Sequence, residues 1–353
     1  MKLRGLFIGE CFIMAASDWG LNVNENWQYY NSRAGIALSF LFPLLVFKTG
    51  FEWHWLVYCL VIHRVHVFGH SLCLHTYFSH KAFKTNRIMQ FFLGIIAIGS
   101  HLGSPFQYTF LHQQLHHPRA DKEGDPHSPV HGLWHAFLGW RFKEYVTSST
   151  GQQLFRLKDI YQYADPAFKN CPEMRFICKH CFEIQNLSFP AFYLIGMFVE
   201  AYIPQMGINA LAFFVYFKAI PCALSQFGLL SINVMGHAKW YGYRNFSSDD
   251  NSRNSNLGFF LWGSTCWHNN HHYMPNSAKT SFTTRETLID VDYLIVLMME
   301  KMGLAWDVKL PSQKLVDKGI MEGVKRPPRY RKDKDPDDDE DDISDNPDYK
   351  MAA

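Results

Sequence analysis

Four long apolar stretches most constrain how this chain can fold. They are AGIALSFLFPLLVF (34–47), WHWLVYCLVIHRVHVFGHSLCL (53–74), LSFPAFYLIGMFVEAYIP (187–204) and the run from 208 to 236. A helix that crosses a bilayer needs about 20 mainly apolar residues. The stretches therefore predict an all-α integral membrane protein, with four transmembrane helices in two hairpins over 34–74 and 187–236. A fifth run, 88–100, is too short to span and favours an interfacial or re-entrant helix.

This layout places three polar regions on one side of the membrane: the N-terminus, the loop 75–186 and everything after 237. We expect a cytosolic N-terminal segment (1–32), a membrane domain (33–312) and a C-terminal tail (313–353). The acidic run Asp335–Asp342 has no apolar residue to bury, so the tail is predicted to be disordered. Within the second stretch, His63, Arg64 and His66 must face the protein interior, because polar groups are costly in lipid.

Charge and cysteine content exclude other classes of protein. The net charge of +2 comes with no concentrated basic face, so we expect no nucleic-acid partner. The segment CPEMRFICKHC holds Cys171, Cys178, His180 and Cys181, which is a possible zinc site. There is no second such cluster elsewhere, so structural cysteines are the preferred interpretation. Glu10 interrupts the short apolar run near the N-terminus, which argues against a cleaved signal peptide.

Histidines gather just beyond the ends of the apolar stretches. Nine of the 18 histidines fall in four motifs, together with one asparagine: His75 and His80; His112, His116 and His117; Asn233 and His237; His268, His271 and His272. On a helix, residues three and four apart share a face, so His268, His271 and His272 are expected to point to one place. His75 and His80 would diverge by roughly 140° on a regular helix, so they need a helix end between them or serve two different metals.

The number of imidazoles indicates the kind of site. Neutral imidazole binds iron, zinc and copper, and nine of them exceed the ligands of one tetrahedral zinc. Soluble di-iron proteins instead use Glu-x-x-His motifs, and this chain has none. We therefore predict two metal ions held almost wholly by histidine, in a helical cap on the cytosolic side.

The same motifs resemble those of the membrane-bound fatty acyl desaturases, in particular the group that includes the stearoyl-CoA desaturases. GHSLCLHTYFSHKAFKT is similar to the first histidine box of the family, and GSPFQYTFLHQQLHH with DKEGDPHSP is similar to the second. NVMGHAKWYGYRN resembles the segment that supplies an asparagine and a further histidine, and CWHNNHH resembles the third box. The resemblance covers roughly residues 33–312.

One departure concerns the second box, which in the family is usually His-x-x-His-His. Here three residues separate His112 from His116, so either His112 or Gln113 occupies the first position. A one-residue insertion can be absorbed as a π-bulge, a feature found at functional sites. We take His112, His116 and His117 as the ligands.

The resemblance implies a di-iron enzyme that uses O2 and two external electrons to insert a cis double bond, at carbon 9, into a saturated acyl chain on coenzyme A or a lipid. It also implies that Asn233 binds one iron weakly. A methylene has no acidic proton, so a metal-bound oxidant beside a dry, apolar tunnel has to attack it. Aromatic residues near the boxes are candidates for lining that tunnel: Tyr77, Phe78, Trp134, Trp140, Trp240 and Trp262.

The loop after the second box has three interpretations. Asp121, Asp125 and His127 orient ligand imidazoles, contact the polar head of the acyl carrier, or simply belong to a loop that turns at Gly124 and Pro126. The chain has no haem, flavin or ferredoxin motif, so we expect an external electron donor, either a ferredoxin or a b-type cytochrome. The plasma membrane and the endoplasmic reticulum are both open as locations. Alternative functions are a membrane di-iron hydroxylase or alkane monooxygenase and, in another class, a non-enzymatic metal or haem carrier.

Overall fold

The structure is a computed structural model that describes residues 24–148, 150–168 and 170–325. Within these ranges the chain is mostly helical. The longer helices are α1 (Glu25–Leu41), α3 (Trp53–Phe68), α4 (Arg87–Gly99), α8 (Cys181–Tyr202), α10 (Ile220–Met235) and α14 (Val291–Lys301). The shorter ones are α2 (Val46–Thr49), α5 (Pro105–Thr109), α6 (Leu133–Phe137), α7 (Pro172–Lys179), α9 (Ala210–Phe214), α11 (Phe259–Trp262), α12 (His268–Tyr273), α13 (Thr284–Thr287) and α15 (Gln313–Gly319).

Three helical runs are long and apolar enough to cross a membrane. They are Glu25–Thr49, Trp53–Ser79 and Ala210–Met235, and they contain three of the four predicted spans almost completely. The first begins at Glu25, where the Asn24 side chain accepts a hydrogen bond from the Trp27 N–H, and it therefore starts well before residue 34, the start of the predicted span. The predicted span 187–204 lies in α8, which has 22 residues but is not among the three runs.

The long helices present apolar side chains to their surroundings. α1 and α2, α3 and α8 all carry exposed large apolar residues, among them Leu41, Leu44, Phe47, Val57, Val61, Val65, Leu194 and Phe198. A soluble protein rarely exposes so many together, so this belt is a lipid-facing surface. His63 is buried, and Arg64 donates to the carbonyls of Phe259 and Phe260, which confirms that the polar groups of α3 face the protein.

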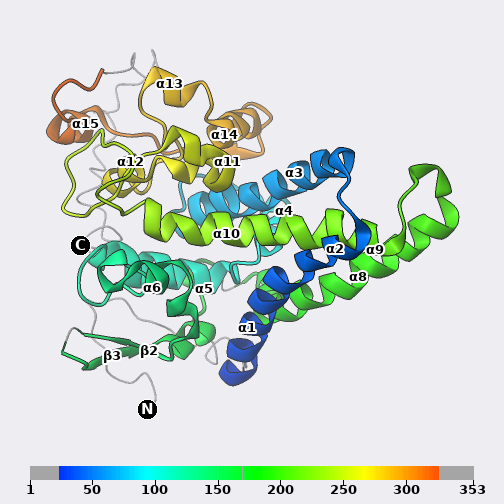
Figure 1. Ribbon diagram of the computed structural model, residues 1–353. Coiled ribbons are helices and arrows are strands. Elements are labelled where there is room, and N and C mark those ends of the chain that lie inside the picture. The colour runs from blue at the N-terminus through cyan, green and yellow to red at the C-terminus, as the bar shows by residue number, and fades with distance from the viewer. Residues whose placement is uncertain (1–23, 149, 169, 326–353) are drawn as a thin grey trace.

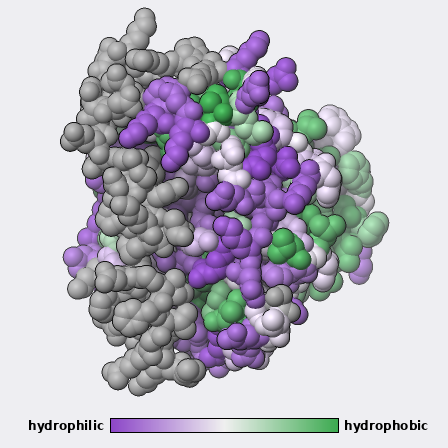
Figure 2. All heavy atoms as spheres, turned by 90° about the vertical axis from the view of Figure 1, so that its left-hand side faces the viewer, coloured by the Kyte–Doolittle hydropathy of each residue, from purple (hydrophilic) through white to green (hydrophobic). Residues whose placement is uncertain are grey.

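The remaining elements form a cap at one end of the long helices. Figure 1 shows α11 to α15, α5, α6 and the β2–β3 pair gathered at the end opposite the α8–α9 connection. The strands are β2 (Tyr145–Thr147) with β3 (Gln153–Arg156), and β1 (Lys84–Thr85) with β4 (Ala305–Trp306), both antiparallel. The face of the cap in Figure 2 is mostly hydrophilic where it is coloured, unlike the belt of the long helices.

One boundary differs from the predicted one. Residues 313–325, assigned to the disordered tail, include α15, and its Val316 is buried against Phe246 and Phe282. The cap therefore extends past residue 312, because these apolar residues have a partner surface; the acidic run lies outside the described residues.

Cys178 and Cys181 are buried in the core between α4, α7 and α8. Among the described residues no cysteine joins a group that converges on a possible metal position.

Candidate metal centre

The first histidine pair is brought together by a π-helix. α3 continues without a break into a π-helical segment, Gly69–Ser79, and the N–H of His80 donates to the carbonyl of His75 at 3.0 Å. This i→i+5 hydrogen bond places residues five apart on similar faces. The helix ends at Ser79, between the two histidines, which is one of the two predicted arrangements. Both rings enter the same cluster, with centroids 4.7 Å apart, so the alternative of separate positions is wrong.

The second box also lies in a π-helix, as its extra residue predicts. α5 continues into the π-helical segment Phe110–His116, and the N–H of His117 donates to the carbonyl of His112. The Nε2 atoms of these two histidines lie 3.1 Å apart. The Gln113 side chain instead contacts Nδ1 of His80, at 2.6 Å, on the outer side of that ring. The structure therefore places His112, and not Gln113, inside the cluster.

Cluster 1 is formed by the histidines of three boxes. His75, His80, His112 and His271 are buried, and their potential ligand atoms all lie within 4.8 Å of one another. His117 joins them, because its Nε2 is 3.1 Å from that of His112 and 3.0 Å from that of His271. Five imidazole rings from distant parts of the sequence thus face one position.

Cluster 2 lies beside it and is formed by His116, His237, His268 and His272. The Nε2 of His268 is 2.9 Å from that of His237 and 3.1 Å from that of His272, which in turn is 3.4 Å from that of His116. The expectation that His268, His271 and His272 point to one place is wrong, since His271 belongs to cluster 1. Consecutive helical residues point about 100° apart, so the pairs 116/117 and 271/272 each supply both clusters.

Asn233 lies one helical turn before His237 on α10. Its side-chain N–H donates to the carbonyl of Ala136 at 3.2 Å, and the residue lines the cavity beside the clusters. It is not one of the residues whose donor atoms converge. Its predicted role as a weak ligand stays a prediction.

Three carboxylates contact the outer nitrogens of three of the four cluster 2 histidines. Asp121 accepts from Nδ1 of His237 at 2.8 Å, and Asp125 lies 3.1 Å from Nδ1 of His116. Asp250 accepts from Nδ1 of His272 at 2.8 Å. A carboxylate on Nδ1 fixes the tautomer that leaves Nε2 free to bind a metal. The geometry agrees with the predicted imidazole-orienting interpretation of Asp121 and Asp125, and it adds Asp250.

Burial and hydrogen bonding oppose each other at these carboxylates. Burial alone raises the pKa of Asp121, Asp125 and Asp250, but the hydrogen bonds and charges of the neighbouring histidines outweigh it and bring each pKa below its usual value. The three groups are therefore anionic at neutral pH. His127, the other residue predicted from this loop, lies 3.7 Å from Asp125 and 4.4 Å from the His116 ring, measured between centroids.

Five of the clustered imidazoles are neutral at physiological pH. Burial, followed by repulsion from neighbouring histidines, holds the pKa of His80, His112, His117, His268 and His271 well below 6.5. His237 differs, because its hydrogen bond to Asp121 outweighs burial and raises its pKa. Neutral imidazoles with converging Nε2 atoms are suitable ligands for a first-row transition metal. The residues present therefore fit a pair of metal ions.

The two clusters differ in what supports them. In cluster 1, the outer nitrogen of His80 contacts an amide, that of Gln113. Among the described residues, Nδ1 of His75 and Nδ1 of His271 have no hydrogen-bond partner. In cluster 2 the outer nitrogen of His268 is likewise without a hydrogen-bond partner among the described residues, but the other three histidines have anionic partners. Positive charge is consequently stabilised more strongly at cluster 2 than at cluster 1.

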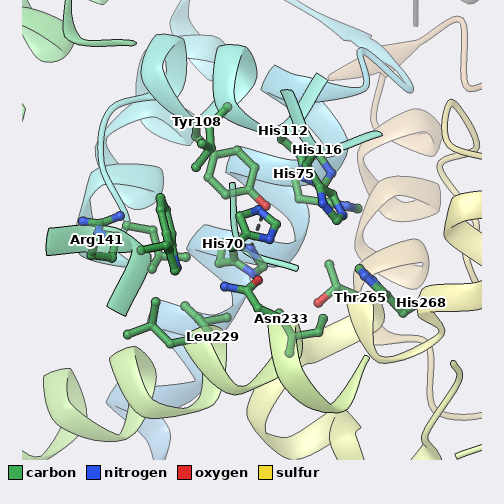
Figure 3. Close-up of a pocket in the computed structure, with 16 residues that line it drawn as sticks. His70, His75, Tyr108, His112, His116, Arg141, Leu229, Asn233, Thr265 and His268 are labelled. Atoms are coloured by element: carbon green, nitrogen blue, oxygen red, sulfur yellow. Dashed lines mark hydrogen bonds between the residues drawn. The ribbon is translucent and has the colours of Figure 1, made fainter. Parts of the chain in front are cut away.

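A cavity opens beside both clusters. Figure 3 shows His75, His112, His116 and His268 along one side of it and Leu229 and Asn233 of α10 along another. Leu102, Leu111, Leu230 and Ile232 add apolar wall. Of the aromatic residues predicted to line a tunnel, Trp140 lines this cavity. Trp134 and Trp240 are exposed, and Tyr77, Phe78 and Trp262 are packed in the core.

Sequence reasoning missed several residues of this site. Asp250 lies in the irregular segment between α10 and α11, where no spacing rule connects it to a histidine. His70 and Tyr108, which are hydrogen-bonded at 3.0 Å, line the cavity (Figure 3). His70 precedes His75 by five residues in the same π-helical segment, so the five-residue period from His75 to His80 was a signal that, extended backwards, finds it.

Comparison with known proteins gives the same family as the motifs. The fatty acid desaturase family model matches residues 53–281. The Delta-9 acyl-lipid desaturase 2 of Arabidopsis thaliana is 30% identical over 266 residues, which cover 74% of this chain and 77% of that protein. The hex-5-enoyl acyl-carrier-protein acetylenase of Moorena producens is 29% identical over 298 residues, covering 80% and 83%. The acyl-CoA C20 Delta5-desaturase of Anemone leveillei is 27% identical over 267 residues, covering 75% and 77%.

The family match covers more than half of the chain, and the residues it includes contain all nine histidines of the two clusters. The chain therefore belongs to the fatty acid desaturase family and is a membrane oxidoreductase that acts on acyl chains.

Proposed function

We propose that this protein inserts a cis double bond at carbon 9 of a saturated fatty acyl chain, with O2 as the oxidant and two iron ions as the cofactor. The observation that carries the proposal is the convergence of the Nε2 atoms of nine histidines on two adjacent positions beside an apolar cavity. In this proposal His75, His80, His112, His117 and His271 bind one iron. His116, His237, His268 and His272 bind the other, with Asn233 as a weak additional ligand.

The iron pair, when bound, supplies the oxidising power that removes two hydrogens from adjacent methylenes. The residues of the chain do the rest. Asp121, Asp125 and Asp250 each accept a hydrogen bond from Nδ1 of a cluster 2 histidine and hold its Nε2 toward the metal position. Leu229, Leu230 and the other apolar wall residues orient the acyl chain and keep bulk water away from it.

The relatives leave room for other positions of the double bond. Their names include Delta-9, Delta-5 and acetylenase activities, at 23–30% identity. Carbon 9 is supported by the two acyl-lipid desaturases of Arabidopsis thaliana and by the motifs that resemble the stearoyl-CoA desaturases. The acyl carrier in this proposal is coenzyme A or a lipid, and the electrons come from a separate ferredoxin or b-type cytochrome.

We also propose four membrane crossings, with α8 as the third and the cap on the cytosolic side. α8 is longer than the roughly 20 residues that a span requires. Its outward residues Leu187, Leu194, Ile195, Met197 and Phe198 are exposed apolar side chains. With four crossings, the histidines after α3 and those after α10 lie on the same side of the membrane.

The test is expression of the protein in a host that lacks its own acyl desaturase, followed by gas chromatography of fatty acid methyl esters. We expect a new monounsaturated species, with the bond located by mass spectrometry of a derivative. His272→Ala should abolish it, because His272 contacts His268 and His116 in cluster 2. His131→Ala is the matched control, since this exposed cap histidine lies outside both clusters.

The product also decides between neighbouring functions. An alcohol in place of an alkene would replace the desaturase with a hydroxylase. Full product from His272→Ala would contradict the ligand assignment, and a purified protein with a Soret band would instead indicate a haem carrier.

A further inference from the structure

The helix that carries the third histidine box is too short to be stable without outside contacts. α12 has six residues, and the side chain of Trp267, which precedes it, makes no capping hydrogen bond. A helix of this length does not form on its own in water. His271, which α12 supplies to cluster 1, has no hydrogen-bond partner at Nδ1 in the described part of the chain. Contacts from other segments must therefore fix α12, and with it the direction of the His271 ring.

Two asparagines on the opposite side of α12 make such contacts. At about 100° per residue, Asn269 and Asn270 point away from the three histidines of the helix, and both are fully buried. Their backbone N–H groups donate to the side-chain oxygen of Asn254, at 2.9 Å and 3.1 Å. The Asn269 side chain accepts from the N–H groups of Asn245 and Phe246, both at 2.9 Å. These hydrogen bonds fix the start of α12.

Glu286 completes this network from α13. It is fully buried, and its Oε2 accepts from the Asn270 side chain at 3.0 Å and from two backbone N–H groups of its own segment. Its Oε1 accepts from the Tyr243 hydroxyl at 2.6 Å and from the Asn245 side chain at 2.9 Å. A buried carboxylate has to replace its lost hydration with hydrogen bonds. Five donors do so here, and one of them belongs to the histidine-box helix.

We propose that Glu286 is a positioning residue for the metal ion of cluster 1. Its hydrogen bond to Asn270 fixes the rotation of α12 about the helix axis, and that rotation sets where Nε2 of His271 points. Glu286 is neither among the residues whose ligand atoms converge nor in the cavity wall, so it acts only through α12. The inference rests on the proposed function, because it requires a metal ion at each cluster.

Cluster 2 depends less on this contact. His272, on the same helix, is hydrogen-bonded directly to Asp250 and therefore keeps its direction without the glutamate. His268 is the first residue of α12, where the contacts of Asn254 with the following N–H groups remain. His271 has no comparable second support. Loss of the glutamate contact should therefore disturb cluster 1 first.

Glu286→Gln breaks the contact with the smallest change in size. A carboxylate accepts hydrogen bonds at both oxygens, whereas the nitrogen of an amide can only donate. Each oxygen of Glu286 faces at least two donors. In either orientation, the glutamine amide therefore meets donors with its own N–H groups, and the network that holds Asn270 has to rearrange.

The test measures the binding of cobalt(II), a spectroscopic substitute for iron, to purified full-length protein from which metal has been removed. His237→Ala leaves cluster 1 complete, and His80→Ala leaves cluster 2 complete. In these two backgrounds, the visible absorption of bound cobalt, followed against a competing chelator, gives the affinity of each cluster separately. Adding Glu286→Gln should weaken cobalt binding at cluster 1 by about 10–100-fold and change binding at cluster 2 much less.

Asn270→Ala tests whether the effect passes through α12. We expect this change to weaken cobalt binding at cluster 1 at least as much as Glu286→Gln does. Adding Glu286→Gln to it should cause little further loss, because the contact between the two residues is already absent. Losses that add would show that Glu286 acts by another route and would overturn the inference. Asn270→Ala also provides the test if Glu286→Gln protein does not accumulate.

Asp290→Asn is the matched control. Asp290 is another buried carboxylate of the cap, and it accepts from the Ser264 hydroxyl and from the N–H groups of Ser281 and Tyr293, but from no residue of α12 within the described ranges. It should lower the melting temperature, as Glu286→Gln does, and leave both cobalt affinities unchanged. An equal loss of cobalt in Asp290→Asn, or wild-type affinity at cluster 1 in Glu286→Gln, would count against the inference. If the wild type does not bind a pair of cobalt ions, the proposed function fails instead.

Discussion

At the scale of single residues, the site depends on which nitrogen of each histidine faces inward. In cluster 2 the outer nitrogens of His116, His237 and His272 contact Asp125, Asp121 and Asp250. A neutral imidazole donates from one nitrogen and accepts at the other, so these contacts determine where the free lone pair points. The sequence predicted the histidines by type and spacing. It did not predict Asp250, because a long-range contact has no periodicity.

The first prediction at this scale concerns Asp250. Asp250→Asn keeps the side-chain size and removes the charge that supports His272, so we expect metal affinity to fall by about 10–100-fold. Metal content after graded chelation, measured on purified protein, checks this. Asp249→Asn changes the adjacent carboxylate, which has no resolved contact with a clustered histidine, and should retain metal as the wild type does. Equal retention by both variants would contradict the role of Asp250.

At the scale of elements, the π-helical segments are what bring the boxes together. A regular α-helix would separate His75 from His80 and His112 from His117, whereas an i→i+5 hydrogen bond links each pair. For the second box, the extra residue predicted the π-bulge. For the first box, the five-residue spacing did not predict a π-helix, because that spacing is equally compatible with a helix end.

The first π-helical segment also depends on close packing against α4. A Cβ built on Gly69 would lie 2.4 Å from the carbonyl oxygen of Ile96, which is backbone and cannot move alone. We therefore expect Gly69→Ala to destabilise the protein by about 1–3 kcal/mol and to lower its metal content, since His75 and His80 would shift. Thermal unfolding in detergent measures the first effect and metal analysis the second.

Gly99→Ala is the matched control for that change. A Cβ at Gly99 meets no atom within 4 Å, and the residue lies at the end of α4. The usual gain from replacing glycine by alanine in a helix is up to about 1 kcal/mol, so this variant should be neutral or slightly more stable. Loss of stability in Gly99→Ala equal to that in Gly69→Ala would show that contact with Ile96 is not the cause.

At the scale of the whole molecule, the long helices and the cap both supply histidines to the site. α3 and α10 each end next to a cluster, and the cap supplies the remaining histidines through the second and third boxes. Many imidazoles are therefore buried together, which makes the stability of the metal-free protein depend on pH. The rings whose pKa is lowered by burial are neutral in the folded state and take up protons only when the chain unfolds.

The direction of that dependence follows from the pKa values. His80, His112, His117, His268 and His271 have pKa values well below 6.5 in the folded protein, so below 6.5 the unfolded chain binds more protons. The free energy of unfolding therefore falls as pH falls, by up to about 1.4 kcal/mol per pH unit for each histidine. The pKa of His237 is raised, so this one group makes the free energy of unfolding change with pH in the opposite direction.

The measurement is the melting temperature of chelator-treated protein between about pH 7.5 and pH 5.5, the range around the ordinary histidine pKa. We expect a steep decrease on the acid side of 6.5. The metal-loaded protein should resist acidification further, because bound metal competes with protons for the same nitrogens. A flat profile for the metal-free protein would contradict the burial of neutral imidazoles.

The sequence by itself determined the class of the protein, three candidate membrane helices and the identity of the clustered histidines. Apolar length and residue type are local properties, and a helix or an imidazole ligand can be recognised from them. The sequence also indicated the π-bulge at His112, because a one-residue insertion has few ways to be absorbed. These predictions needed no knowledge of which segments meet in space.

Tertiary structure alone decided how the histidines divide between two clusters and which carboxylates support them. His271 and His272 are adjacent in the chain yet serve different clusters, and Asp250 reaches His272 from a separate segment. Lys218 and His101 are 117 residues apart and meet only inside the helix bundle. Such contacts arise when many segments pack together, and no local sequence pattern predicts them.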